Sequence, residues 1–387
     1  MVLLDLLGPG STVWYHPARL RILLDYRPAL RQRTGVGEYA HHLAEAMVAR
    51  SSRNRSVTLF SSSWKDRLPK DAIPGAGRLD LPIPVKLLNL AWHRAGWPPV
   101  ETLGSDAEVV WSLHPLLMPS RWAAQVVTIH DLFFLDHPEA TSAEVRRDYP
   151  ALAAKHARAA DAVIVNSEYT RDLVTSRLEV PPDRITVCYP GAPRWHPRAE
   201  PSAPGPILHM GTIEPRKNVG AIIKAYRGMV ERDPGVPPLL LAGRMTVPEE
   251  SILSPDDKAL LRDRVLFFGY VTDEQRRRLY REASLLVIAS SDEGFGIPAL
   301  EAMTIGLPVV AAARGSLPEV IGEAGLLVDA DNANVLADAM RRLLDDGELR
   351  RDLAARGLER AKRFEWAASA ALLLEAFRGA IARRAVR

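Results

Sequence analysis

Short runs of apolar residues recur along the first half of the chain. They are rich in β-branched side chains, which is typical of buried strands. Longer stretches between several of them, such as "SAEVRRDYPALAAKHARAA" (142–160), have the periodicity of helices. Strands that alternate with helices predict βαβ units and a parallel sheet. The predicted strands are "LRILLDY" (20–26), "SVTLFSS" (56–62), "EVVWSL" (108–113), "QVVTIHD" (125–131), "ADAVIVNS" (160–167) and "ITVCYPG" (185–191).

The alternation stops at "RWHPRAEPSAPGP" (194–206), which contains four prolines and few residues that could pack in a core. This composition predicts a linker. Afterwards the alternation resumes, with helices expected over 217–232, 273–283 and 297–305. The second set of predicted strands is "ILHMGT" (207–212), "PLLLAG" (238–243), "VLFFG" (265–269), "LLVIAS" (285–290), "PVVAA" (308–312) and "GLLVD" (325–329).

We therefore predict an α/β fold with two doubly wound, Rossmann-like parallel-sheet domains. A length of 387 residues suits two domains better than one core. The N-terminal domain is expected over 1–195, where 1–19 is interpreted as an extension before the first strand, and the C-terminal domain over 196–365. Ligands are expected at the carboxyl ends of the strands and in the cleft between the domains.

Composition narrows the classes of function. The net charge of +3 is mild, and no long basic block or zinc-ligand pattern points to nucleic acid. A single cysteine excludes an internal disulfide and fits the reducing cytoplasm. No apolar run approaches the roughly 18–20 residues of a membrane span, and the N-terminus lacks the features of a secretory signal.

The segment "SDEGFGIPALEAM" (291–303) follows a predicted strand and enters a predicted helix. Its glycines allow close approach of a ligand, and the helix start offers free N–H groups to a phosphate or a sugar hydroxyl. Glu301 lies one turn inside the helix, where it can hold a cis-diol such as a ribose, while Glu293 in the loop can hold another polyol. The alternative is a structural turn in which Glu293 caps the helix and Glu301 is solvated.

Two further segments place polar residues at strand ends. In "HMGTIEPRKN" (209–218), the adjacent Arg216 and Lys217 near a helix start suit a diphosphate, although a solvated basic turn has the same pattern. In "TIHDL" (128–132), His130 follows a buried strand. A lone histidine is more often structural than catalytic, and direct pairing with Asp131 is disfavoured because neighbours on a strand face opposite ways.

The segment "TGVGEY" (34–39) brings Gly35 and Gly37 to a junction between a loop and a helix. Its G-x-G spacing lacks the third glycine of a dinucleotide fingerprint, which argues against a Rossmann dehydrogenase. The G-x-G spacing is compatible with a loop that contacts a phosphate or an acceptor.

Together these segments resemble the retaining GT-B glycosyltransferases of family 4. The resemblance rests on "GTIEPRKN", on "SDEGFGIPALEAMTIGLPVVAAARGSLPEVIGEAGLLVD" with its Glu-x7-Glu spacing, and on the looser "TIHDL" and "VNSEYTR". It covers nearly all of 20–380. Residues 366–387 look like the terminal helix that crosses back to the N-terminal domain in this fold.

The resemblance implies a donor that is a nucleotide-sugar, with no metal and no other cofactor. Arg216 and Lys217 would neutralise the departing diphosphate, Glu293 would position the donor sugar, and His130 would contact the transferred sugar, so these four form the expected catalytic set. Neither glutamate would act as acid or base in the manner of a glycosidase. The expected donor-binding residues are Gly35, Gly37, Gly211, Gly243, Arg244, Tyr270, Val271, Gly294, Phe295, Gly296, Ile297 and Glu301.

The similarity to bacterial members makes GDP-mannose the first expectation for the donor, within cell-surface polysaccharide biosynthesis. The acceptor, a glycan or a polyprenyl-linked glycan, should meet the N-terminal domain. The segment 81–103 suggests an amphipathic helix on the inner leaflet, with ordinary packing as the alternative. Its apolar residues Leu87, Leu88, Leu90, Trp92 and Trp97 lie near Lys86, His93 and Arg94. A nucleotide-sugar 2-epimerase of the same fold and a non-catalytic sugar-nucleotide-binding partner remain the rival functions.

Overall fold

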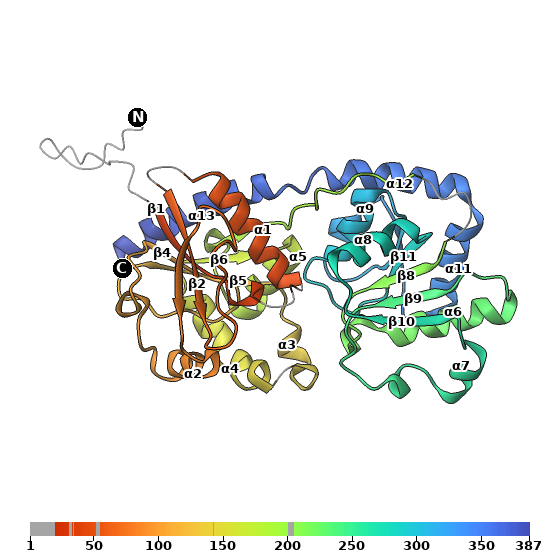
Figure 1. Ribbon diagram of the computed structural model, residues 1–387, viewed down its shortest axis with the longest axis horizontal. Helices are drawn as coiled ribbons and strands as arrows, with labels where there is room; N and C mark the ends of the chain where they lie inside the picture. Colours follow the sequence, from red (N-terminus) through yellow and green to blue (C-terminus); the bar gives the residue numbers. More distant parts are fainter. Residues whose placement is uncertain (1–19, 31–32, 34, 52–54, 142, 200–204) are drawn as a thin grey trace, which may run out of the picture.

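The structure is a computed structural model that describes residues 20–30, 33, 35–51, 55–141, 143–199 and 205–387. The described chain forms two α/β domains that lie side by side (Figure 1). Each contains one parallel sheet, so the prediction of two doubly wound parallel-sheet domains is confirmed. The predicted boundary between residues 195 and 196 falls between the two sheets. The predicted extension 1–19 lies outside the described residues.

The first sheet has seven strands in the order β3-β2-β1-β4-β5-β6-β7. The order reverses between β1 and β4, and the adjacent strands pair in parallel. β3 is an edge strand inside the proline-rich stretch 68–84, for which the sequence predicted no strand. The strands are β1 (Leu20–Asp25), β2 (Arg55–Ser62), β3 (Gly77–Leu81), β4 (Val109–Ser112), β5 (Ala124–Ile129), β6 (Ala162–Val165) and β7 (Ile185–Val187).

Helices cover both faces of this sheet, which explains its continuous apolar strands. Alternate residues of β1 enter different cores. Ile22 and Leu24 pack with helices α1 (Gly35–Ala49) and α13 (Trp366–Val386), whereas Leu23 packs with α2 (Val85–Ala95). The helices that precede the linker are α1 (Gly35–Ala49), α2 (Val85–Ala95), α3 (Phe133–Asp136), α4 (Ala143–Ala159) and α5 (Glu168–Leu178).

The second sheet has six parallel strands in the order β10-β9-β8-β11-β12-β13, and its order reverses between β8 and β11. The strands are β8 (Ile207–Met210), β9 (Leu239–Ala242), β10 (Val265–Gly269), β11 (Leu285–Ile288), β12 (Val309–Ala312) and β13 (Leu326–Val328). The helices are α6 (Val219–Arg232), α7 (Pro255–Leu260), α8 (Asp273–Glu282), α9 (Ile297–Ile305), α10 (Leu317–Ile321), α11 (Ala333–Asp345) and α12 (Gly347–Ala361).

The last helix, α13 (Trp366–Val386), returns from the second domain to the first (Figure 1). It packs against α1 and β5 and contributes Leu373, Leu374 and Phe377 to the core of the first domain. The Phe377 ring lies 5.4 Å from that of Trp111, between ring centroids. The C-terminal segment is therefore part of the N-terminal domain's core.

We expect Phe377→Ala to lower the free energy of unfolding by about 3–5 kcal/mol, because it leaves a cavity beside a fully buried tryptophan. Urea unfolding followed by tryptophan fluorescence measures this loss. Leu372→Ala is the matched control on the same helix, since Leu372 is 49% exposed and its truncation should cost less than about 1 kcal/mol. Equal losses in the two variants would contradict this role of α13.

Candidate functional site

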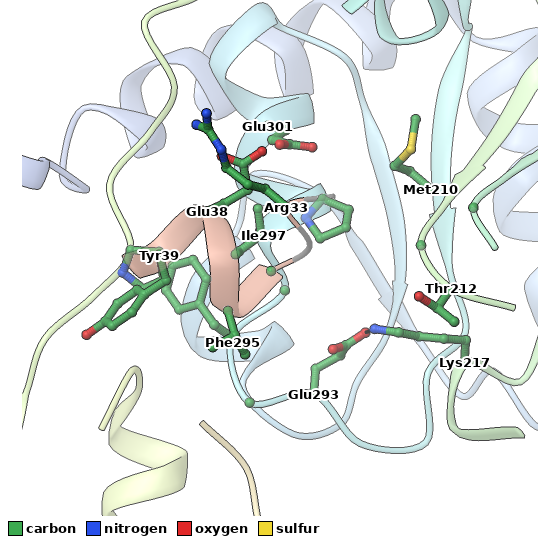
Figure 2. A pocket seen from close by; sticks show the side chains of 18 of the residues that line it. Arg33, Glu38, Tyr39, Met210, Thr212, Lys217, Glu293, Phe295, Ile297 and Glu301 are labelled. Atoms are coloured by element: carbon green, nitrogen blue, oxygen red, sulfur yellow. Dashed lines mark hydrogen bonds and ion pairs between the residues drawn. The ribbon is translucent and has the colours of Figure 1, made fainter. Parts of the chain in front are cut away.

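A cavity of about 400 Å³ lies between the two domains, at the carboxyl ends of β8, β9 and β11 (Figure 2). The first turn of α1 forms its opposite wall, as Figure 2 shows for Glu38 and Tyr39. The reversal of strand order between β8 and β11 creates this opening, because the connections from the two strands diverge to opposite faces of the sheet. The cavity therefore lies where a doubly wound fold binds ligands.

Two glycines bring backbone segments together around the cavity. A Cβ atom on Gly294 would lie 1.8 Å from the carbonyl oxygen of His130 in the other domain, so only glycine fits there. A Cβ atom on Gly243 would lie 1.8 Å from the carbonyl oxygen of Gly211. These contacts require the absence of a side chain, and they leave the floor of the cavity lined with backbone.

Glu293 lies buried between the two adjacent cations. Lys217 Nζ is 2.5 Å from Glu293 Oε1, and Arg216 Nη1 is 3.0 Å from Oε2. Figure 2 shows the lysine side chain extended toward the carboxylate. Ser290 Oγ donates a third hydrogen bond of 2.7 Å to Oε1. The sequence alternatives of a solvated basic turn and a capping glutamate are both wrong, because the three charged side chains form one ion cluster and Gly296 occupies the N-cap of α9.

Burial opposes ionisation of Glu293, but the charges of Lys217 and Arg216 outweigh it and lower the pKa of this carboxyl to about 2. The same pairing raises the pKa of Arg216 despite the desolvation of its guanidinium. Arg216 also lies 3.1 Å from Glu214, so the two cations are matched by two carboxylates. Both cations lie next to the N-terminus of α9, where the free N–H groups and the helix dipole favour an anion.

Glu301 lies on the other side of the cavity and is also buried, so the alternative of a solvated Glu301 is wrong as well. Tyr280 donates a hydrogen bond of 2.8 Å to Oε2, and Arg276 Nη1 lies 3.0 Å from Oε1. Burial raises the pKa of Glu301, while Arg276 and Tyr280 act in the opposite direction. Arg276 also lies 3.4 Å from Glu38 of the first domain, so one guanidinium links Glu301 to the opposite wall.

His130 lies at the boundary between the domains. Its Nε2 atom donates a hydrogen bond of 3.2 Å to the carbonyl oxygen of Leu113, which leaves Nδ1 as an acceptor. Burial lowers its pKa to about 4, so the ring is neutral at pH 7. Asp131 instead accepts a hydrogen bond from the N–H of Phe133, in agreement with the argument against a His130–Asp131 pair.

The cavity brings together all the residues predicted for the site except Gly37. Gly37 lies in the first turn of α1, where a Cβ atom would be 2.7 Å from the carbonyl oxygen of Pro28. Its position supports packing of α1 against the preceding loop, and not the predicted role in donor binding. Gly35, by contrast, lines the cavity near Ile297.

Several lining or supporting residues had no assignment from the sequence, Arg276, Tyr280 and Asn166 among them. Arg276 and Tyr280 belong to a charged helix whose pattern is that of a solvated surface. Asn166 lies within the quoted "VNSEYTR" motif and lines the cavity at 6% exposure, and its buried Oδ1 has no hydrogen-bond partner. Such an unsatisfied oxygen marks a position for a ligand or water. In the described part of the chain, no group of three His, Cys, Asp or Glu side chains is arranged to hold a metal ion.

Comparison with known families agrees with this geometry. The model described as Glycosyltransferase Family 4 matches residues 33–194, and the model described as Glycosyl transferases group 1 matches residues 197–360. The chain belongs to glycosyltransferase family 4. Both domains of this family 4 enzyme are covered, and the cavity between them is its candidate active site.

Relatives and solved structures support the same family and fold. The O-antigen chain mannosyltransferase B of Escherichia coli is 26% identical over 90% of this chain and 96% of its own. The D-inositol 3-phosphate glycosyltransferase of Corynebacterium glutamicum is 31% identical, but the match spans 58% of each chain. The structure of Anabaena HepE in complex with UDP and glucose has a TM-score of 0.67 at 19% identity, over 92% of this chain and 98% of HepE, which establishes the GT-B fold.

We expect Lys217→Ala to destabilise the glycosyltransferase in a pH-dependent way. The pKa of Glu293 is lowered only in the folded state, so the cluster stabilises the protein above about pH 4, the ordinary glutamate value, and this stabilisation is lost as pH falls toward 2. The variant should melt roughly 5 °C lower at pH 7, and the difference should shrink between about pH 5 and pH 3. Lys224→Ala, at an exposed position on α6, provides the matched control.

Thermal melts at several pH values measure the effect. A difference in melting temperature between Lys217→Ala and the wild type that stays constant from pH 7 to pH 3 would contradict this prediction. It would show that the lysine stabilises the fold through its aliphatic stem and not through Glu293.

Proposed function

We propose that this glycosyltransferase moves a hexose from a nucleoside diphosphate sugar to a hydroxyl of a glycan or lipid-linked glycan, with retention of configuration. The observation that carries the proposal is the pair of fixed cations, Arg216 and Lys217, held by Glu293 beside the start of α9. As the donor's glycosidic bond breaks, the diphosphate gains negative charge. Two fixed cations and the helix N-terminus stabilise that charge without a divalent metal ion.

The rest of the cavity provides groups for the two sugars of the donor. Tyr280 and Arg276 hold the Glu301 carboxylate in place, and its oxygens can still accept hydrogen bonds from the hydroxyls of a ribose. Arg244 stacks on Tyr270 at 5.7 Å from the ring centroid, at the end of the cavity assigned to the nucleotide base. The backbone at Gly294, Phe295 and Gly296 faces the transferred sugar, with Asn166 as an additional contact.

Mannose is the proposed sugar and GDP-mannose the proposed donor. Support comes from the full-length similarity to the E. coli O-antigen chain mannosyltransferase, which also supports a place in cell-surface polysaccharide biosynthesis. UDP, which occupies the similar Anabaena HepE structure, is the alternative nucleotide. GDP and UDP differ only in the base, so a direct comparison of donors that carry these nucleotides distinguishes the two possibilities.

A thermal-shift panel of GDP-mannose and UDP- and dTDP-sugars tests the donor. A bound donor raises the melting temperature by mass action, and we expect the largest increase with GDP-mannose. Lys217→Ala should weaken donor binding by roughly tenfold to a hundredfold, because it removes a charge-assisted contact to the diphosphate. Lys224→Ala should bind as the wild type does.

Unchanged donor affinity in Lys217→Ala would overturn the phosphate role. Mass analysis of products then checks the reaction itself, since transfer lengthens the acceptor by one hexose, whereas neither epimerisation nor mere binding gives an acceptor-linked product.

We also propose that the enzyme acts in the cytoplasm with a peripheral contact to the membrane. Leu87, Leu90 and Trp97 on and after α2 are 61%, 46% and 63% exposed, and Lys86 beside them is exposed too. The expectation that Leu88 and Trp92 share this surface is wrong, because each packs in the core at 3% exposure. The Trp92 indole donates to the carbonyl oxygen of Pro98, so substitution of Trp92 would test the fold. No helix among the described residues is long and apolar enough to span a bilayer.

Flotation with vesicles that contain anionic lipid tests this contact. We expect the wild type to float and the double variant Leu87→Ser/Trp97→Ser to stay in the dense fraction, because two large apolar side chains no longer insert. Phe268→Ser, at a 45% exposed position on β10, is the control and should float. A wild type that stays in the dense fraction would remove the proposal.

A further inference from the structure

A second cavity, of about 830 Å³, adjoins the candidate donor site. The two cavities share walls formed by Val36, His130, Asp131, Glu214 and Arg216. A ligand in the second cavity would therefore meet a sugar in the first at these shared residues. The volume lies within the usual range of roughly 300–1,000 Å³ for small-molecule sites.

Aromatic side chains from α3 and α4 line one wall of this second cavity. The Phe134 and Tyr149 rings meet edge to face with centroids 5.5 Å apart, and the His114 ring stacks on Tyr149 at 6.3 Å. Phe133 lies under the Arg216 guanidinium at 5.8 Å. Fixed aromatic faces of this kind offer apolar area to the C–H face of a pyranose ring, and the tyrosine adds a polar end.

The charged side chains of this wall are mainly acidic. Asp131, Glu139 and Glu214 supply three carboxylates. Among the described residues that line it, Arg216 is the one lysine or arginine, and it is already paired with Glu293 at 3.0 Å and with Glu214 at 3.1 Å. Carboxylate oxygens accept hydrogen bonds from sugar hydroxyls, but they repel a phosphate.

His114 and His130 do not offset the negative charge of these carboxylates. Burial keeps His130 neutral, and His114 Nε2 lies 3.3 Å from the buried carboxylate of Asp25. The wall therefore combines stacking surfaces with hydroxyl acceptors, and the part of it that the structure describes has no unpaired lysine or arginine for an anionic group.

We propose that the second cavity binds an unphosphorylated sugar unit of the acceptor glycan. This inference rests on the proposed transferase function and specifies the class of its acceptor. The acceptor hydroxyl meets the donor sugar at the wall that the two cavities share, beside His130 and Asp131. Its oxygen forms a bond to the anomeric carbon of the donor sugar, the bond from that carbon to the diphosphate breaks, and the hydroxyl proton passes to the departing diphosphate.

Saturation-transfer NMR tests the site without any donor, using an α-linked mannotriose and D-inositol 3-phosphate as probes. We expect the wild type to bind the trisaccharide more tightly than the inositol phosphate. Tyr149→Ala should weaken trisaccharide binding by about tenfold through loss of the stacking face, and the matched Tyr149→Phe, which keeps the ring, should stay within about threefold of wild type.

Glu139→Lys provides a second variant that does not disturb the core, because the Glu139 side chain is 69% exposed. It should strengthen inositol phosphate binding and not trisaccharide binding. Two outcomes would overturn the inference: tighter binding of inositol phosphate than of trisaccharide by the wild type that Lys217→Ala does not reduce, or equal trisaccharide binding by Tyr149→Ala and wild type. Trisaccharide binding by a protein that binds no nucleotide-sugar would support this site and overturn the transferase proposal instead.

Discussion

The ion cluster around Glu293 is the interaction on which the rest of the site depends. A buried carboxylate is costly unless it is paired, and here two cations and a serine hydroxyl surround it. The pairing connects the loop after β8 to the loop after β11, and Arg216 adds a hydrogen bond of 2.9 Å to the carbonyl oxygen of Asp292. The two connections that diverge at the reversal of strand order are thus fixed relative to each other, with both cations next to the start of α9.

That fixed loop also sets how the domains meet. Gly294 packs directly on the carbonyl oxygen of His130, so a site residue of one domain lies against the glycine loop of the other. Glu319 of α10 accepts hydrogen bonds from the first N–H groups of α5, at 2.8 Å from Glu168 and 3.1 Å from Tyr169. A carboxylate at that position satisfies free donors and complements the helix dipole. The contact between the domains and the candidate active site are therefore parts of one polar network.

Much of the fold was predictable because both sheets are covered by helices on both faces. Doubly buried strands give continuous apolar runs that stand out from their surroundings, as "AVIV" of β6 does. β3 was missed because it is a partly exposed edge strand in a proline-rich stretch. The surface position predicted for Trp92 was wrong because an amphipathic pattern cannot tell which tryptophan of a helix and its flank faces the core.

The sequence by itself determined the two-domain α/β architecture and the residues that gather at the strand ends. Buried strands and turns each leave a pattern in the residues next to one another along the chain, so both can be recognised locally. It also identified the segments that carry Arg216, Lys217, Glu293 and Glu301. Only the tertiary structure decided how their charges combine. The pairing of Glu293 with two cations, the link from Arg276 to Glu38 and the acidic wall of the second cavity join residues far apart in sequence, and such contacts depend on distances that no local pattern contains.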